Sequence, residues 1–149
     1  MTKSIPLTKG KLALVDDEDY EYLSSKTWNY LFGGYARSGT GELMHRVIMG
    51  NPKGVMIDHV NGDKLDNRRS NLRLATRSEN FANGIVSKRN KSGCKGVCWS
   101  RQMNKWDVRI KVNRKQIFLG LRDDLEEAKT LYREEHIKRF GEYSIFNKE

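Results

Sequence analysis

Short apolar runs that alternate with polar residues occupy the first third of the chain and predict β-strands. The runs lie at residues 11–15, 28–31 and 43–48, with a weaker candidate at 20–23. Glycine-rich sequences at 33–34 and 38–41 separate them as turns. A further apolar run, Val55–Val60, ends in charged side chains and precedes the turn sequence Asn61-Gly62-Asp63. The polar stretch that follows, residues 64–74, has no regular periodicity, so no element is predicted there.

Helical and strand-like patterns alternate in the second half of the chain. Thr76 and Glu79 have the spacing of a capping box, which predicts a short helix that carries Asn80 and Asn83. Three strand-like runs follow at residues 96–101, 106–112 and 115–120. Residues 125–140 repeat apolar side chains at helical spacing, after an Asp123-to-Glu126 start and before Gly141 as the stop. The order of elements predicts an α+β fold that ends in a three-stranded antiparallel sheet packed on one helix.

Composition limits the classes of protein that this chain can represent. Its 149 residues, 37% of them hydrophobic, suffice for one ordinary domain or two small ones. Two cysteines, Cys94 and Cys98, exclude a disulfide-rich scaffold and a four-cysteine zinc site, and we expect small buried or reduced thiols. No apolar run approaches the roughly 18 residues of a membrane-spanning helix. Residues 1–10 lack a signal-like apolar segment, so we expect a cytoplasmic protein without a membrane partner.

Charge is concentrated in one part of the chain. The formal net charge is +9, and residues 85–122 contain eleven lysines and arginines against a single acid, Asp107. Trp99 and Trp106 lie within this segment. Basic residues interleaved with aromatic ones in a folded segment favour a nucleic-acid surface. Composition alone leaves a merely basic soluble protein as the alternative.

The adjacent residues Asp58 and His59 are the first candidates for chemistry. A carboxylate is a good ligand for a hard divalent cation, and a neutral imidazole is the usual general base near pH 7. A nearby asparagine could orient the imidazole, and another could complete a metal site. From spacing alone, the pair could equally be structural or solvent-exposed. The asparagines of this region could all be turn or cap residues, and they include Asn61, Asn67, Asn71 and Asn83.

The segment around this pair resembles an HNH endonuclease module, in the version found in free-standing homing endonucleases of bacteriophages. The resemblance rests on Met44-His45-Arg46, on the string from Ile57 to Arg73 (IDHVNGDKLDNRRSNLR) and on Ser78-Glu79-Asn80. It implies a ββα-metal fold, in which two strands and a helix surround one divalent ion. It further implies that His59 is the general base and that Asn71 orients it. In the same way, Asp58 and Asn80 are implied as metal ligands.

The chain departs from the family pattern where many HNH modules carry a last histidine. That position holds Asn80, and Asn83 competes with it because residues three apart share a helix face. Family spacing favours Asn80, and the oxygen donors favour Mg²⁺ or Mn²⁺ over a histidine-rich zinc-like site. His45 precedes the module, and both a place near the phosphate and a structural role stay open. The arginines expected to contact the DNA backbone are Arg46, Arg68 and Arg73.

Residues 93–141 resemble an Apetala-type (ethylene-response-factor) DNA-binding domain. The resemblance rests on Gly93, the strings 95–101, 105–110 and 118–120, and the helix from Leu125 to Phe140 with Ala128 and Gly141. In that family the sheet enters the major groove. The DNA-contacting candidates carried over are Trp99, Arg101, Trp106, Arg109, Lys111 and Lys115. Alternation supports Arg109 and Lys111 on one strand face opposite Val108 and Ile110, whereas Trp106 shares the parity of Val108 and could belong to the core.

Four segments follow from these predictions. They are a strand region supporting the nuclease (1–43), the HNH module (44–86), a basic linker (87–92) and the Apetala-type domain (93–149). The predicted function is metal-dependent hydrolysis of double-stranded DNA by a site-preferring, homing-type nicking enzyme, with no small-molecule cofactor beyond the metal. A monomer would nick, whereas a homodimer could cut both strands, in the host cell cytoplasm if the chain is phage-encoded. The alternative is a non-catalytic, sequence-specific DNA-binding regulator with a degenerate nuclease module.

Overall fold

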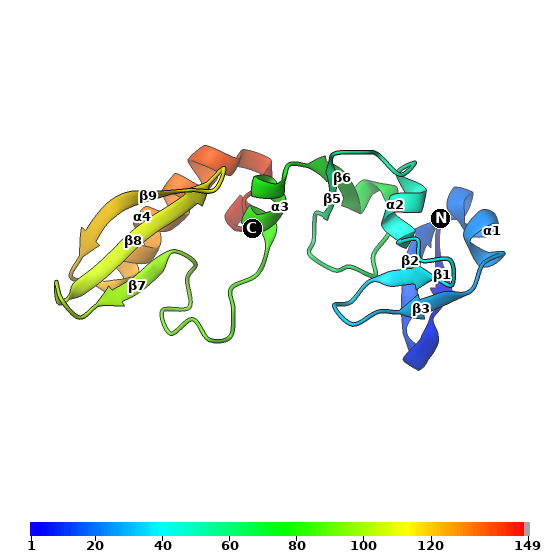
Figure 1. The fold of residues 1–149 in the computed structure, drawn as a ribbon, viewed down its shortest axis with the longest axis horizontal. Helices are drawn as coiled ribbons and strands as arrows, with labels where there is room; N and C mark the ends of the chain where they lie inside the picture. The colour runs from blue at the N-terminus through cyan, green and yellow to red at the C-terminus, as the bar shows by residue number, and fades with distance from the viewer. Residues whose placement is uncertain (148–149) are drawn as a thin grey trace. The chain divides into compact units, whose positions relative to one another are not determined.

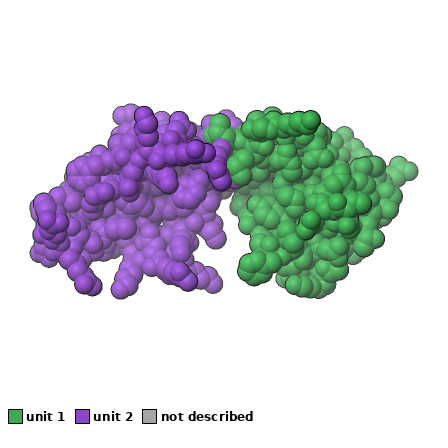
Figure 2. Space-filling view, viewed as in Figure 1, with its two compact units in different colours: residues 1–76 green, residues 77–149 purple. Residues whose placement is uncertain are grey.

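The computed structural model describes residues 1–147, and the chain divides into two compact units, residues 1–76 and residues 77–149 (Figure 2). The fold is α+β, as the sequence predicts, with small antiparallel sheets and four α-helices among the described residues. Lys148 and Glu149, which end the predicted C-terminal domain, lie outside the described residues. Within residues 1–147, no helix combines the length and the apolar character needed to cross a lipid bilayer.

The first unit contains three two-stranded antiparallel sheets and two short helices (Figure 1). The strand pairs are β1 (Thr2–Pro6) with β2 (Leu12–Asp16), β3 (Trp28–Tyr30) with β4 (Ala36–Ser38), and β5 (Met56–His59) with β6 (Leu72–Ala75). The helices are α1 (Asp17–Ser24) and α2 (Met44–Ile48), and single 3-10 turns cover Thr8–Gly10 and Arg69–Asn71. The β5–β6 hairpin carries Asp58 and His59.

Side chains from all three sheets of the first unit meet in one hydrophobic core. Trp28 is 2% exposed, and its indole N–H donates to the carbonyl oxygen of Leu23 at 2.8 Å, so its one polar atom has a partner. Ile57 of β5 and Leu72 of β6 belong to the same core. Their burial attaches the β5–β6 hairpin to the rest of the unit.

The loop between β5 and β6 is held against β2. The N–H of Leu14 donates to the carbonyl oxygen of Leu65, and the N–H of Asn67 donates to that of Leu14, both at 2.8 Å. Asp66 forms an isolated parallel bridge with Leu14 between these two bonds. Backbone hydrogen bonds therefore fix the part of this loop around Leu65 to Asn67.

Two segments of the first unit that the pattern assigns to strands are helices instead. In the segment 43–48, residues 44–48 form α2, because the buried side chains of Met44, His45 and Ile48 follow helical rather than twofold spacing. Residues 20–23 lie in α1, whose first turn consists of acids at the positive end of the helix dipole. The pattern also missed β1, β4 and β6. Strand β4 has only three residues, and β6 has only four and directly follows a polar loop.

The second unit begins with α3 (Arg77–Asn83), at the place the capping-box spacing predicts. The predicted three-stranded antiparallel sheet is confirmed, in the order β7 (Val97–Ser100), β8 (Lys105–Val112) and β9 (Lys115–Arg122). The predicted long helix is confirmed as α4 (Leu125–Phe140), which packs on this sheet (Figure 1). Short 3-10 turns cover Gly141–Tyr143 and Ile145–Asn147.

The alternation predicted for β8 is confirmed. Val108 and Ile110 are buried in the second core together with Ala128 of α4, whereas Arg109 and Lys111 are exposed. The sheet therefore has one apolar face on the helix and one face with basic side chains toward solvent.

The structure decides two points that the sequence left open or predicted differently, namely the burial of Trp106 and the N-terminal cap of α4. Trp106 is half-buried against the second core, and its ring makes an edge contact with Trp99 at a centroid distance of 5.1 Å. Helix α4 is capped by Asp124, not Asp123. Its carboxylate accepts hydrogen bonds from the N–H groups of Glu126 and Glu127 at 2.8 and 3.0 Å.

A buried histidine lies in the core of the second unit. His136 of α4 is 1% exposed, and its Nδ1 lies 2.7 Å from Oγ of Ser144, which is also buried. Burial, with a smaller contribution from the charge of Lys95, lowers the pKa of His136 from 6.5 to about 4. The folded protein therefore keeps this imidazole neutral at pH 7.

We expect the second unit to lose stability as the pH falls from 7 toward 4. The unfolded chain protonates His136 near pH 6.5 and the folded chain only near pH 4, so unfolding takes up a proton between these values. The full stability is present above pH 6.5, and the loss at pH 4 amounts to as much as about 3 kcal/mol. Urea unfolding of wild type and His136→Gln at several pH values measures it. The variant should show a shallower pH dependence, and equal slopes would contradict the assignment.

Candidate active site

Asp58 and His59 are the last two residues of β5, and both are 4% exposed. The hairpin register places Asp58 opposite Arg73 and His59 opposite Leu72. Nε and Nη2 of Arg73 donate to Oδ2 of Asp58 at 2.9 and 2.8 Å. Burial excludes the solvent-exposed alternative for this pair, and the carboxylate has a guanidinium as its counter-ion.

Hydrogen bonding fixes the tautomer of His59. Its Nε2 lies 3.3 Å from Oδ1 of Asn67, whose Nδ2 donates to the carbonyl oxygen of Leu65 at 3.2 Å. Because that amide oxygen can only accept, Nε2 carries the hydrogen of the neutral ring. Nδ1 therefore holds the lone pair and is the basic atom.

A second histidine and a tyrosine surround this imidazole. The His45 ring, from α2, makes an edge contact with the His59 ring at a centroid distance of 5.1 Å. The Tyr35 ring lies 5.3 Å from His45 and 6.1 Å from His59. Burial, together with the neighbouring His59 and Arg46, lowers the pKa of His45 to about 4. Burial likewise lowers the pKa of His59, although the Asn67 hydrogen bond opposes the shift. Both rings are therefore uncharged near pH 7.

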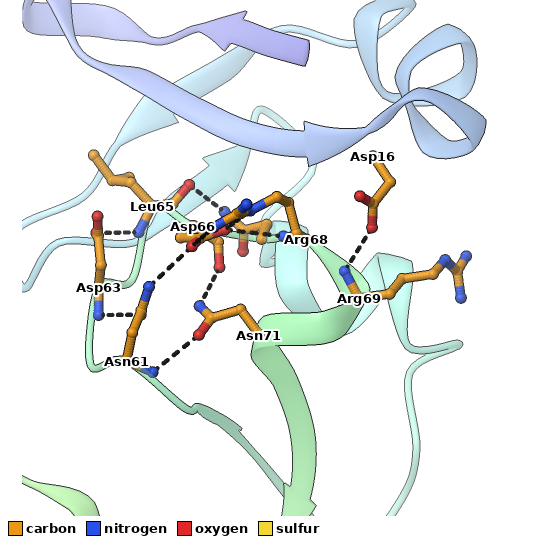
Figure 3. Close-up of polar contacts among 9 residues, drawn as sticks. Asp16, Asn61, Asp63, Leu65, Asp66, Arg68, Arg69 and Asn71 are labelled. Atoms are coloured by element: carbon orange, nitrogen blue, oxygen red, sulfur yellow. Dashed lines mark hydrogen bonds and ion pairs between the residues drawn. The ribbon is translucent and has the colours of Figure 1, made fainter. Parts of the chain in front are cut away.

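Asn71 holds the loop that carries Asn67 (Figure 3). Its Oδ1 accepts from the N–H of Asn61 at 2.9 Å, and its Nδ2 donates to the carbonyl oxygen of Asp66 at 2.7 Å. The Asp66 carboxylate in turn accepts from Nδ2 of Asn61 and from the guanidinium of Arg68. That Asn71 orients His59 stays a prediction. Through these bonds Asn71 could act on His59 indirectly, by holding the loop in which Asn67 contacts the imidazole.

We expect Asn71→Ala to destabilise the first unit by about 2–4 kcal/mol, because one buried and one partly buried backbone group lose their partners. Thermal or urea unfolding measures the change. Asn29→Ala is the matched control, since Asn29 is an exposed asparagine of the same unit. Equal stability of the two variants would mean that the Asn71 side chain does not hold the loop.

The three arginines predicted to contact DNA near the motif all have protein partners. Arg46 donates to the carbonyl oxygens of Pro52 and Val55. Arg68 pairs with Asp66 at 2.6 Å, and Arg73 pairs with Asp58. Their phosphate contacts stay predictions. Arg68 and Arg73 bond within the β5–β6 hairpin and its loop, whereas Arg46 bonds to the segment that precedes β5.

The predicted site residues belong to both units. Asp58, His59 and Asn71 lie in residues 1–76, whereas Asn80 and its competitor Asn83 lie on α3 in residues 77–149. The predicted module, residues 44–86, thus takes elements from both. Within residues 1–147, no group of three or more His, Cys, Asp or Glu side chains is arranged to hold a metal ion.

Of the candidates of the second unit, Arg109 and Lys111 lie on the exposed face of the β7–β8–β9 sheet. Arg109 is held by Asp107, whose two carboxylate oxygens accept from Nε and Nη2 at 2.8 Å each. The Arg109 guanidinium also lies 5.8 Å from the ring centre of Phe118. The other exposed candidates are Trp99, Arg101, Lys111 and Lys115, with Trp106 half-buried. Cys98 is exposed and Cys94 buried, both as free thiols.

Sequence reasoning did not predict that three residues contact His59. They are Asn67, His45 and Tyr35. The sequence named Asn67 only as a turn or cap residue and left His45 open. The position of Asn67 eight residues after His59 carries no periodic signal, because an irregular loop joins them.

Comparison with known proteins identifies the region of the site. The HNH endonuclease family model matches residues 42–82. Protein 3.8 of Escherichia phage T7 is 40% identical over 82 residues, which cover 55% of this chain and 68% of that protein. The uncharacterized HNH endonuclease L560 of Acanthamoeba polyphaga mimivirus is 30% identical over 150 aligned positions, which cover 94% of this chain and 76% of the relative. No solved structure matches the chain.

Proposed function

The chain belongs to the HNH endonuclease family, and on that premise we propose that it hydrolyses phosphodiester bonds of double-stranded DNA in a metal-dependent reaction. We further propose a homing-type enzyme that prefers particular sites, uses His59 as its general base and nicks one strand at a time. One site per chain acts on one strand, so a monomer nicks and a homodimer could cut both strands.

The buried Asp58–His59 pair at the end of β5 carries this proposal. It lies inside the segment that matches the family, and β5, β6 and α3 follow one another in ββα order. The neutral His59 ring has its hydrogen on Nε2, where Asn67 accepts it. We propose that Nδ1, the unprotonated nitrogen of this tautomer, takes a proton from an attacking water, as a general base does.

The family pattern assigns donor types that suit a hard cation, and we propose that such an ion would be held together with the substrate. Asp58 offers a carboxylate and Asn80 an amide oxygen, with Asn83 as the competitor on the same helix. Mg²⁺ is commonly bound by one or two carboxylates together with waters and substrate phosphates, and Mn²⁺ accepts the same ligands. When bound, such an ion would stabilise the phosphoryl and leaving oxygens of the scissile bond. Arg73 keeps the Asp58 side chain in one position on the hairpin.

We propose that the second unit supplies affinity for DNA, in the manner of an Apetala-type domain. The exposed face of the β7–β8–β9 sheet supports this role, because the basic side chains of Arg109 and Lys111 project from it opposite the apolar face. Asp107 fixes the guanidinium plane of Arg109, and a fixed guanidinium can contact a base edge or a phosphate with less loss of side-chain freedom.

A supercoiled plasmid that carries DNA from the source genome tests the function, in the presence of Mg²⁺, Mn²⁺ or EDTA. We expect open circles with the ions and intact plasmid with EDTA. Linear DNA as the first product would indicate paired cuts by a homodimer. Intact plasmid under all conditions, combined with a gel shift that EDTA does not change, would overturn the proposal in favour of a DNA-binding regulator.

A further inference from the structure

The turn that joins β3 to β4 presents a fully exposed aromatic side chain. Phe32 is 98% exposed, the same fraction as the N-terminal methionine. The backbone around it is nevertheless fixed. Leu31 N–H donates to the carbonyl oxygen of Tyr35 at 2.8 Å, and Gly34 N–H donates to that of Leu31 at 3.0 Å. Gly33 has a φ of +104°, which suits the third position of a tight turn and places Phe32 at its corner.

This turn is tied to the residues around His59. Nζ of Lys64, from the loop after β5, donates to the carbonyl oxygen of Gly33 at 2.7 Å. The same ammonium group lies 4.5 Å from the ring centre of Tyr35, and that ring lies 6.1 Å from His59. Phe32 is therefore held, through Gly33 and Lys64, on the scaffold that positions the imidazole.

Charge around the turn favours nucleic acid over another protein as the partner. From Trp28 to Ser38 the sequence contains one charged residue, Arg37, and no acid. Lys64 adds a second positive charge directly beside the turn. A large apolar side chain flanked by cations is the combination with which proteins insert into stacked bases while they contact the phosphates.

We propose that Phe32 stacks on, or inserts between, bases of the duplex beside the phosphodiester bond that is cut. This proposal rests on the proposed function and adds a base-contacting element to the nuclease unit itself. The rigid turn presents the ring without an ordering step on binding, which favours affinity. A distorted base step next to the scissile bond would also give site preference through the deformability of the DNA sequence.

The test begins with the full-length wild type and a nick mapped on plasmid DNA. Duplexes of about 30 base pairs spanning that nick then carry the fluorescent base analogue 2-aminopurine at successive positions around it. The variants are Phe32→Ala, Phe32→Trp, which keeps an aromatic ring, and Tyr22→Ala, which removes another exposed aromatic ring of the same unit. Because Phe32 has almost no buried surface, thermal unfolding should not distinguish Phe32→Ala from wild type.

We expect Phe32→Ala to bind the duplex roughly 5- to 100-fold more weakly, the range for losing one aromatic–base stack. The 2-aminopurine signal should change at one step with wild type and Phe32→Trp, and not with Phe32→Ala. The salt dependence of binding should be unchanged, since no phosphate contact is lost. Tyr22→Ala should behave as wild type.

Three outcomes would overturn the inference while leaving the nuclease function intact. The first is wild-type affinity and nicking by Phe32→Ala. The second is a loss of affinity equal to that of Tyr22→Ala. The third is a change in oligomeric state on Phe32→Ala, measured by sedimentation, which would assign the ring to a contact between two copies. Failure of the wild type to nick any DNA would instead refute the proposed function.

Discussion

His59→Ala should lower the rate of plasmid nicking by roughly 100- to 10,000-fold, the usual contribution of a positioned general base. The ring is neutral and its hydrogen is on Nε2, so removing it eliminates the basic nitrogen that the proposed reaction uses. Affinity for DNA should stay near that of wild type, because we propose that binding relies on other parts of the chain. Single-turnover nicking rates and a gel shift of the same DNA measure the two quantities separately.

Two controls separate lost chemistry from lost structure at this position. His59→Gln keeps a side-chain group that can donate to Asn67 but has no base, so it should be as inactive as His59→Ala and more stable. Imidazole added to His59→Ala should restore part of the activity if the cavity admits it. Normal nicking by either variant would show that another group takes the proton.

Gly96→Ala should unfold or strongly destabilise the second unit. A Cβ at Gly96 would lie 2.0 Å from the carbonyl oxygen of Arg109 and 2.3 Å from Cε2 of Tyr132, and the backbone has a φ of +68°. The steric overlap and the left-handed conformation together cost on the order of 3–5 kcal/mol. That is a large part of the free energy of unfolding of a small unit. Urea unfolding followed by the fluorescence of Trp99 and Trp106 measures it.

Gly93→Ala is the matched control for this substitution. Gly93 has a similar φ of +71°, but a Cβ at this position would meet no atom within 4 Å, so only the backbone cost of about 1 kcal/mol applies. If Gly96→Ala is as stable as Gly93→Ala, Tyr132 and the Arg109 carbonyl oxygen do not lie as close to Gly96 as the structure places them. DNA binding should fall with Gly96→Ala and persist with Gly93→Ala, because the sheet carries Arg109.

Local patterns predicted the second unit well. Three local signals indicate the same fold there. Strand β8 alternates strongly, its flanking turns have Asn104 and Asn113 at positive φ, and the helix is bounded by an aspartate cap and Gly141. The helix start at Asp123 was wrong by one residue, since two successive aspartates offer the same capping group. In the first unit, residues 43–48 were assigned to a strand because six residues are too few to separate a period of two from one of 3.6.

The sequence by itself determined the order of elements in the second unit, the α+β class, the basic character of residues 85–122 and the HNH motif around Asp58 and His59. Only the tertiary structure decided which groups surround the imidazole. His45, Tyr35 and Asn67 reach it from a helix, a hairpin and an irregular loop. The physical reason is that periodicity reports which face of one element is buried. Contacts between elements distant in the sequence depend on how the core packs them together.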